Sequence, residues 1–475
     1  MKINYQPILP PFMNDVQDIV RAFYPYIEID DDAPQTLSVS YSLKNCRMLV
    51  GIVFEGRTKY FSENIPSGLS EILYKKAAKK FVKTTLYLFC VKLTGKELPY
   101  GSLTGVHPLY VYRELKLNFQ NPRVALERDF YVSPSRASLL REVSETQCGY
   151  FSNSDVNCDL YINVPFCPTR CSYCSFISTE VGRVKAQIPE YAAKLRKEIE
   201  ETLEVIAVRG RKLRSVYVGG GTPFSLSAET LKQILEPLKG VSFTAVTRGQ
   251  LKRTGEFTIE AGRPDAITRE KLEAALELGV TRISVNPQTL NDATLVKIGR
   301  NHTAADFFAS YALAREYPFE INVDLIAALP DETFEDFRST VDGVIALAPD
   351  NITVHTLSIK HGSQLNLADY KKSAEGVALA QTDYAHTALN AAGYFAYYLY
   401  RQKNTADNLE NVGYAKKGKE CVYNIDYMEE TNTVYACGAG AVTKFVFNTQ
   451  NRIERVSGAK DLNTYLERPL PPKEL

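Results

Sequence analysis

The sequence has no tryptophan, little net charge and no long apolar run. Its 56 basic and 55 acidic residues leave a net charge of +1, which gives no electrostatic reason to expect binding to nucleic acid or to a membrane surface. A membrane-spanning helix needs about 18 or more consecutive apolar residues, and no such run occurs. We therefore expect a protein that binds neither nucleic acid nor membrane.

The cysteines do not suggest a disulfide framework. Nine cysteines in 475 residues do not form the dense pattern of a disulfide-stabilised secreted domain. The first residues lack the basic and apolar regions of a secretory signal. We therefore expect a cytoplasmic protein, in a reducing compartment that leaves its thiols free. We also expect a monomer.

Three of the cysteines lie in one short loop. Cys167, Cys171 and Cys174 follow the apolar stretch 160–164, which is typical of a buried strand. Three thiolates from one loop can hold three irons of a cubane cluster and leave the fourth iron open to a ligand. A zinc site is the alternative, but zinc sites usually add a second CxxC pair or histidines. No such pattern follows in the sequence, so an iron–sulfur cluster is favoured.

The length of the chain favours two or three domains. Residues 1–150 predict an N-terminal α+β accessory domain, with a hairpin over 37–54 and a long helix over 67–93. Residues 151–360 alternate strands with helices, as α/β proteins do. Residues 361–475 leave this alternation and are predicted to form a C-terminal cap.

The central segment predicts parallel strands joined by right-handed crossovers. The expected strands are 160–164, 215–218, 257–261, 282–285, 321–325 and 352–357. The expected helices are 188–208, 228–238, 268–278, 304–316 and 333–347. These units are too few for a closed eight-stranded barrel. We predict an incomplete (β/α)6 barrel with its chemistry at the carboxyl ends of the strands.

Candidate ligand-binding residues follow several of these strands. A run of three glycines after the second strand would let a ligand approach the backbone closely, although a tight turn would also explain it. Polar residues lie at or after the next strand ends, and a helix cap or surface ion pair is the alternative for each one alone. The candidates are Gly219, Gly220, Gly221, Glu260, Gln288, Arg300 and Asp324.

Together these motifs resemble the radical S-adenosylmethionine (SAM) superfamily, and within it the oxygen-independent coproporphyrinogen III oxidase-like branch. The resemblance rests on the cysteine loop, the Gly-Gly-Gly-Thr-Pro run, the strand-end glutamate and the Asp-Leu-Ile motif. The N-terminal segment and the run Tyr-Leu-Tyr-Arg-Gln-Lys-Asn at 398–404 are most similar to HemZ-type coproporphyrinogen dehydrogenases.

The resemblance implies a 4Fe–4S cluster on the three cysteines and one or two bound SAM molecules. In this family, SAM is cleaved reductively to a radical that removes hydrogen from the substrate. Contacts to the SAM that is cleaved fall on Tyr161, Gly220, Gly221 and Glu260. Contacts to a second SAM fall on Tyr173, Thr222, Gln288, Arg300 and Asp324.

Two positions depart from the oxidase pattern. Asn163 stands where the oxidase has histidine, and Phe176 stands where it has a further cysteine that is not a cluster ligand. The cluster is therefore expected to be retained. Because the resemblance places Gly221 against the methionine end of SAM, we expect a side chain there to obstruct SAM and to spare the cluster.

The reaction implied by the resemblance is the oxygen-independent oxidative decarboxylation of coproporphyrinogen III to protoporphyrinogen IX in heme biosynthesis. Its partners would be this tetrapyrrole and a flavodoxin or ferredoxin as electron donor. Four substrate carboxylates need cations, so we expect Arg401 to bind a propionate, with Lys403 and Arg263 as further candidates. Tyr161 and Arg401 are the predicted catalytic residues.

Other interpretations remain open. Ordinary aromatic core packing would explain the run 394–400 without any contact to substrate. One relative in the same branch resembles a heme-binding or heme-delivery chaperone that keeps the cysteine loop. Another radical reaction on a tetrapyrrole, such as ring opening of heme, is a third possibility.

Substitution of Cys167, Cys171 or Cys174 by alanine should remove the 4Fe–4S cluster, because each thiolate would hold one iron. In protein reconstituted without oxygen, we expect loss of the brown chromophore or of its spectral change on addition of SAM. Ultraviolet–visible absorption and iron analysis would measure both. Stoichiometric zinc without iron in the wild-type protein would contradict the cluster.

Overall fold

The computed structural model describes residues 2–5, 12–24, 28–30, 33, 36–105, 107–151, 155–176, 178–248, 251–359, 363, 376–450 and 452–473. The chain divides into two compact units. The first contains Met1–Arg141 and Arg401–Leu409, and the second contains Glu142–Tyr400 and Glu410–Leu475. The predicted boundary near residue 150 lies close to this division. The segment 361–475, predicted as a separate cap, does not form a compact unit of its own.

The first unit contains a five-stranded sheet. Its strand order is β2-β1-β3-β4-β5, with β1 (Lys2–Tyr5), β2 (Glu28–Ile29), β3 (Thr36–Lys44), β4 (Arg47–Phe54) and β5 (Arg57–Asn64). β3 and β4 form the predicted hairpin. Its turn residues Asn45 and Cys46 both have positive φ, as a type I′ turn requires. β5 was not predicted and adds an antiparallel strand beside β4.

Helices α1 (Met13–Phe23) and α2 (Glu71–Thr94) share one apolar core with β3 and β4. α2 confirms the predicted long helix. Ser70 begins it by accepting a hydrogen bond from the backbone N–H of Leu73, and Gly95 ends it with a φ of 71°. Further along the chain are α3 (Pro108–Asn118), α4 (Pro122–Phe130) and α5 (Pro134–Thr146).

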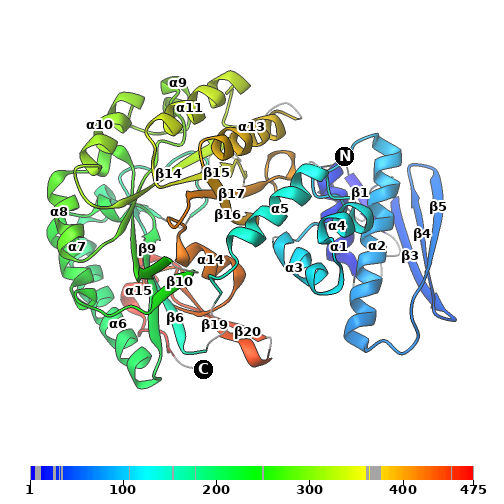
Figure 1. The fold of residues 1–475 in the computed structure, drawn as a ribbon, viewed down its shortest axis with the longest axis horizontal. Coiled ribbons are helices and arrows are strands. Elements are labelled where there is room, and N and C mark those ends of the chain that lie inside the picture. Colours follow the sequence, from blue (N-terminus) through cyan, green and yellow to red (C-terminus); the bar gives the residue numbers. More distant parts are fainter. Residues whose placement is uncertain are drawn as a thin grey trace. The chain divides into compact units, whose positions relative to one another are not determined.

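The second unit is built on an eleven-stranded sheet, in the order β16-β17-β15-β14-β13-β12-β9-β6-β18-β19-β20 (Figure 1). The bounds are β6 (Asn157–Val164), β9 (Lys212–Gly220), β12 (Glu256–Gly262), β13 (Arg282–Val285), β14 (Glu320–Ala327), β15 (Asn351–Thr356), β16 (Tyr394–Arg401), β17 (Glu410–Lys416), β18 (Thr433–Cys437), β19 (Val442–Phe447) and β20 (Arg452–Ser457). Two short pairs lie outside it, β7 (Phe166–Cys167) with β8 (Thr179–Glu180) and β10 (Ala245–Arg248) with β11 (Leu251–Thr254).

The strands β6, β9, β12, β13, β14 and β15 lie side by side in chain order and run parallel. Figure 1 shows helices along the outer side of this curved sheet. The helices between the strands are α6 (Ile188–Val208), α7 (Ala228–Leu235), α8 (Arg269–Glu277), α9 (Asp292–Lys297), α10 (Ala304–Ala314) and α11 (Phe334–Ala346). Among the described residues the outermost strands β16 and β20 do not pair, so the sheet does not close. The predicted incomplete barrel is confirmed.

Strands from the C-terminal segment extend the sheet at both ends. β17 pairs antiparallel with β15, and β18 pairs parallel with β6. The aromatic run 394–401 forms β16, so these tyrosines belong to the sheet. The helices here are α13 (Val377–Ala391), α14 (Val422–Glu429) and α15 (Leu462–Glu467). Within the predicted cap, α13 follows the residues 364–375, which lie outside the described part of the chain.

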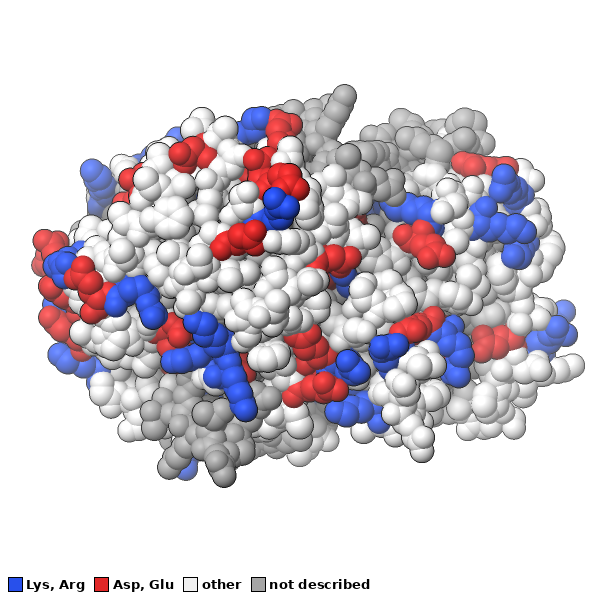
Figure 2. Space-filling view, turned by 45° about the horizontal axis from the view of Figure 1, so that its top comes forward, with Lys and Arg blue, Asp and Glu red and all other residues white. Residues whose placement is uncertain are grey.

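Figure 2 shows lysine and arginine side chains mixed with aspartate and glutamate over the face that it draws. That face has no broad area of a single charge, which agrees with the near-equal numbers of basic and acidic residues in the sequence. Among the helices that the structure describes, none has the length and apolar character needed to cross a membrane.

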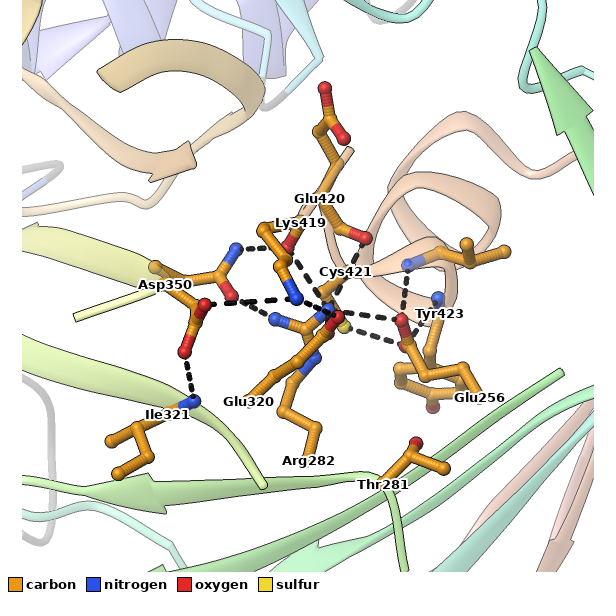
Figure 3. A network of polar contacts seen from close by, with 12 residues as sticks. Glu256, Thr281, Arg282, Glu320, Ile321, Asp350, Lys419, Glu420, Cys421 and Tyr423 are labelled. Carbon is orange, nitrogen blue, oxygen red and sulfur yellow. Dashed lines mark hydrogen bonds and ion pairs between the residues drawn. The ribbon is translucent and has the colours of Figure 1, made fainter. Parts of the chain in front are cut away.

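A buried arginine lies at the amino-terminal end of the parallel strands (Figure 3). Arg282, the first residue of β13, is 1% exposed, and its Nη2 donates to Glu256 at 3.3 Å and to Glu320 at 2.6 Å. The same nitrogen donates to the carbonyl oxygens of Lys419 and Glu420, just before α14. Burial lowers the pKa of Arg282, but the two carboxylates outweigh burial and raise it, so the guanidinium stays charged.

Glu256 also holds the start of α14 (Figure 3). Its carboxylate accepts hydrogen bonds from the backbone N–H groups of Val422 at 3.0 Å and Tyr423 at 3.2 Å. The first N–H groups of a helix have no partner within the helix and favour negative charge. The arginine network therefore fixes both the strand ends and the position of α14.

Substitution of Arg282 by methionine should lower the free energy of unfolding. It would leave Glu256 and Glu320 buried without their cation, and breaking a buried ion pair costs about 3–5 kcal/mol. Urea unfolding followed by circular dichroism would measure the loss. The control is Arg269→Met, which removes an exposed pair with Glu316 and should change stability little. Equal losses in the two variants would contradict the assigned role.

Candidate cofactor site at the carboxyl ends of the strands

Five strands contribute side chains to one accessible region inside the partial barrel. In β6, β12 and β15 a single residue is partly exposed while the rest are buried, and these residues are Tyr161, Glu260 and His355. Tyr217 of β9 donates to Glu260 at 2.7 Å, and Asp324 of β14 lies 3.9 Å from His355. Side chains from five strands therefore meet towards the carboxyl ends, where α/β sheets carry their sites.

The three cysteines lie in the loop after β6, as predicted. Cys167 belongs to β7, and the thiols of Cys167, Cys171 and Cys174 are all free and partly exposed. Burial raises the pKa of the Cys174 thiol to about 11. Bound iron would act in the opposite direction, because a metal cation stabilises the thiolate.

Across the part of the chain that the structure describes, no three His, Cys, Asp or Glu side chains lie close enough to hold one metal ion. A zinc ion gathers its ligands around one centre, whereas the thiolates of an iron–sulfur cluster bind different irons. Three thiolates on one loop suit a 4Fe–4S cluster, and the assignment of its three ligands stays a prediction.

The glycine run is bonded to the cysteine loop. The N–H of Gly221 donates to the carbonyl of Val164 at 2.9 Å, and the N–H of Thr222 donates to the carbonyl of Phe166 at 2.6 Å. The Thr222 hydroxyl also donates to the sulfur of Cys167 at 3.8 Å. These bonds place the run directly beside a predicted cluster ligand.

The hydrogens of these glycines face protein atoms. A Cβ at Gly221 would lie 2.4 Å from the carbonyl oxygen of Phe166, and one at Gly220 would lie 1.7 Å from Oδ1 of Asn163. Gly220 also has a φ of 98°, which favours glycine. A side chain at Gly221 would therefore strike the backbone of the cysteine loop. This differs from the expectation that it would obstruct SAM alone.

Glu260 carries the acidic group nearest to this run. Its carboxylate accepts from the Tyr217 hydroxyl and from the N–H of Gly220, and a Cβ at Gly219 would come within 2.8 Å of it. Burial raises the pKa of Glu260 to about 7, and the charge of Asp324 acts in the same direction. A cation bound beside Glu260 would lower this pKa and keep the carboxylate ionised. The position fits the positively charged groups of SAM.

Tyr173 and Arg300, which are both predicted to contact a second SAM, lie in contact. Nη2 of Arg300 donates to the hydroxyl of Tyr173 at 3.3 Å, and Nη1 donates to the carbonyl of Asn286 at 2.9 Å. The N–H of Ser172 donates to the carbonyl of Ile298 at 3.0 Å. The loop after α9 therefore packs on the cysteine loop.

Gln288 and Asp324 lie on adjacent chain segments. The N–H of Gln288 donates to the carbonyl of Asp324 at 3.1 Å. The side-chain oxygen of Gln288 is buried and has no hydrogen-bond partner within the described structure, which fits a site completed by a ligand. Burial raises the pKa of Asp324, but the nearby His355 and a hydrogen bond from Asn322 outweigh burial and leave the pKa below its ordinary value. Asp324 is therefore ionised.

Two of the three predicted carboxylate anchors, Arg401 and Lys403, lie in the first unit. The guanidinium of Arg401 donates to the carbonyl of Asn408 at 2.9 Å and lies 4.4 Å from the centre of the Tyr100 ring. Lys403 pairs with Asp18 at 3.0 Å. These contacts hold both side chains within that unit.

Asn163 and Arg263 support the loops of the site. Asn163 accepts from the Tyr161 hydroxyl at 2.9 Å and donates to a carbonyl of the loop after β18. Arg263, the further anchor candidate, is 3% exposed and forms a two-pronged ion pair with Asp265. It also donates to the hydroxyl of Thr169 in the cysteine loop at 2.6 Å. Through these contacts, Asn163 and Arg263 stabilise the loops around the site.

The sequence matches the radical SAM superfamily over residues 161–344. It is 33% identical over 470 residues to the oxygen-independent coproporphyrinogen-III oxidase-like protein HemZ of Bacillus subtilis (strain 168), covering 95% of this chain and 92% of that relative. It is 30% identical over 312 residues to the heme chaperone HemW of Haemophilus influenzae, covering 65% of this chain and 75% of that relative.

Among solved structures, coproporphyrinogen III oxidase (HemN) from Escherichia coli aligns with a TM-score of 0.52 and 21% identity, covering 68% of this chain and 71% of that chain. This likeness supports the fold. The partial barrel and cysteine loop define a radical SAM protein, whose cofactors are a 4Fe–4S cluster and SAM. Within that superfamily, the chain belongs to the family of oxygen-independent coproporphyrinogen-III oxidase-like proteins.

Substitution of Gly221 by alanine should reduce both cluster content and SAM binding. The new Cβ would collide with the backbone of the cysteine loop at Phe166, which cannot move without displacing Cys167. Iron analysis after anaerobic reconstitution would measure the effect. Gly182→Ala is the control, because a Cβ at that exposed glycine meets nothing within 4 Å. Full cluster content in the Gly221 variant would contradict the structural role.

Proposed function

We propose that the protein catalyses the oxygen-independent oxidative decarboxylation of coproporphyrinogen III to protoporphyrinogen IX, a step of heme biosynthesis. The similarity to HemZ carries this proposal, since it extends over 95% of the chain at 33% identity. The accessible region inside the partial barrel supports it, because acidic and hydroxyl groups gather there beside the cysteine loop.

Bound together, the cluster and SAM supply a carbon radical that removes a hydrogen atom from the substrate. The side chains of the site bind and orient the reactants. Glu260 and Asp324 offer negative charge to the ammonium and sulfonium groups of SAM. Tyr161 and the glycine run are proposed to complete this binding site. Tyr173, Gln288 and Arg300 are proposed to bind a second SAM together with Asp324.

The substrate places a different demand on the site. Each of two propionate groups loses a hydrogen atom, carbon dioxide and one electron, which leaves a vinyl group. The carboxylates of the substrate would be repelled by Glu260 and Asp324, so they must be bound by cations elsewhere. Arg401 remains our proposed anchor, although binding a propionate would require it to exchange its carbonyl contact at Asn408.

A second candidate function is binding or delivery of heme. The similarity to the heme chaperone HemW, at 30% identity over 65% of the chain, favours it over unrelated radical chemistry. The two functions differ in a simple way. An oxidase consumes SAM and decarboxylates its substrate, whereas a chaperone binds heme tightly and leaves coproporphyrinogen III unchanged.

The test is anaerobic incubation of the reconstituted protein with reductant, SAM and coproporphyrinogen III, followed by mass spectrometry. We expect a product that has lost two carboxyl groups, together with 5′-deoxyadenosine. Tight heme binding without decarboxylation would support the chaperone instead. Arg401→Ala should lower decarboxylation and spare cluster assembly. A normal unfolding curve would be needed to separate this effect from loss of the first unit's structure.

Substitution of Glu260 by glutamine should weaken SAM binding and leave the cluster intact. A hydrogen bond to a charged group contributes about 1.5–3 kcal/mol, so SAM affinity should fall roughly tenfold to a hundredfold. Titration of the cluster absorption with SAM would measure it. The control is Glu429→Gln in α14, a buried carboxyl that accepts from Gln147. Unchanged affinity in the Glu260 variant would contradict the assigned position of SAM.

A further inference from the structure

A stack of tyrosines leads away from the accessible region of the second unit. The rings of Tyr217 in β9 and Tyr423 in α14 lie 4.6 Å apart between centres, with planes inclined by 23°. Tyr423 and Tyr427, one helical turn further along α14, lie 5.7 Å apart with planes inclined by 25°. Three phenol rings are therefore in continuous contact.

The two ends of this stack have different surroundings. At the inner end, the hydroxyl of Tyr217 donates to Glu260 at 2.7 Å, beside the proposed position of SAM. At the outer end, Tyr427 is 39% exposed, and its ring contacts the amino group of Lys444 at 4.0 Å. Tyr423 between them is 5% exposed. The stack therefore connects the site with solvent.

Tyr161 contacts the same rings but has a different partner. Its ring lies 6.4 Å from Tyr217 and 6.2 Å from Tyr423. Its hydroxyl donates to the amide oxygen of Asn163, which is a much weaker base than a carboxylate. Of Tyr161 and Tyr217, Tyr217 is therefore the one whose hydroxyl donates to a strong proton acceptor.

Phenols have a redox chemistry that buried phenylalanines lack. A phenol O–H bond is weaker than an alkyl C–H bond, so a carbon radical takes hydrogen from a nearby tyrosine. Oxidation of a tyrosine is also easier when a base accepts its proton. Rings in contact exchange electrons readily, so an oxidised ring is reduced by its neighbour. Simple packing would need the ring contacts but not the hydroxyl groups.

We propose that Tyr217, Tyr423 and Tyr427 form a relay that carries an unused radical from the site to the protein surface. This inference rests on the proposed function for the source of the radical. The hydrogen atom of the Tyr217 hydroxyl passes to the radical carbon, so a C–H bond forms and an O–H bond breaks. The phenoxyl radical left behind is then passed on to Tyr423 and Tyr427.

Each step along the relay is balanced. One electron and one proton move together from Tyr423 to Tyr217 and then from Tyr427 to Tyr423, so each inner phenol regains its O–H bond. At the surface, a small-molecule thiol gives a hydrogen atom to Tyr427. Two resulting thiyl radicals combine to a disulfide. The relay would protect the cluster loop when the radical forms without substrate.

The first experiment uses the protein without cluster or SAM, so it does not depend on the proposed function. 3-Aminotyrosine, which is oxidised more easily than tyrosine, is placed at position 217. A photogenerated ruthenium(III) tris-bipyridine complex is the oxidant in solution. We expect the aminotyrosyl radical in the electron paramagnetic resonance spectrum. Tyr423→Phe should abolish it, because phenylalanine keeps the ring and loses the phenol.

The control variant is Tyr311→Phe, a buried tyrosine of α10 whose hydroxyl donates to the carbonyl of Leu347. It should leave the aminotyrosyl signal unchanged. Thermal unfolding of both variants would show that the fold is retained. An equal signal with and without the Tyr423 phenol would overturn the relay.

The second experiment uses the reconstituted protein with SAM in deuterium oxide, without tetrapyrrole. Phenol hydrogens exchange with solvent, so a hydrogen atom taken from Tyr217 would bring deuterium into 5′-deoxyadenosine. Tyr217→Phe should lower this incorporation. Undiminished incorporation would overturn the relay. No cleavage of SAM at all would overturn the proposed function, and the result of the first experiment would still stand.

Discussion

Two backbone hydrogen bonds join the loops on which the cofactor site depends. They run from Gly221 to Val164 and from Thr222 to Phe166, and they hold the glycine run against the cysteine loop. Neither bond could form with a side chain at Gly221, because its Cβ would overlap the carbonyl of Phe166. The glycine at position 221 is therefore needed for the packing of the two loops, whether or not a ligand is bound. The separation between the cluster ligands and Glu260 follows from this contact.

The sequence was sufficient to predict the six parallel strands of the core. It did not predict the strands that extend the sheet at both ends. Apolar runs and amphipathic helices alternate over 160–357, and this local pattern predicted β6, β9, β12, β13, β14 and β15. These six strands could be predicted because each pairs with the next one of the set along the chain. β17 and β18 pair instead with strands far away in sequence, and local patterns carry no information about such partners. The aromatic run at 394–401 was therefore not recognised as a strand.

The residues of the site also divide into those that the local sequence predicted and those that it did not. Glu260 and Asp324 were predicted, because a carboxylate near the end of an apolar strand is conspicuous. Tyr217 and His355 were missed, since a tyrosine or histidine within a strand looks like ordinary core until neighbouring strands bring it beside a carboxylate. Arg282 was missed for a related reason. It stands at the first position of its strand, and its partners come from Glu256, Glu320 and the residues before α14.

The segment Arg401–Leu409 belongs to the first unit, although in the sequence it joins β16 to β17 of the second unit. Within the first unit, its Arg401 donates to Leu103, its Lys403 pairs with Asp18, and its Asn408 donates to Ala22. During synthesis on the ribosome, the first 141 residues therefore emerge long before these partners. The first unit can complete its native contacts only after most of the second has been translated. A fragment that ends at Arg141 would lack the segment Arg401–Leu409 and the contacts that this segment makes in the first unit.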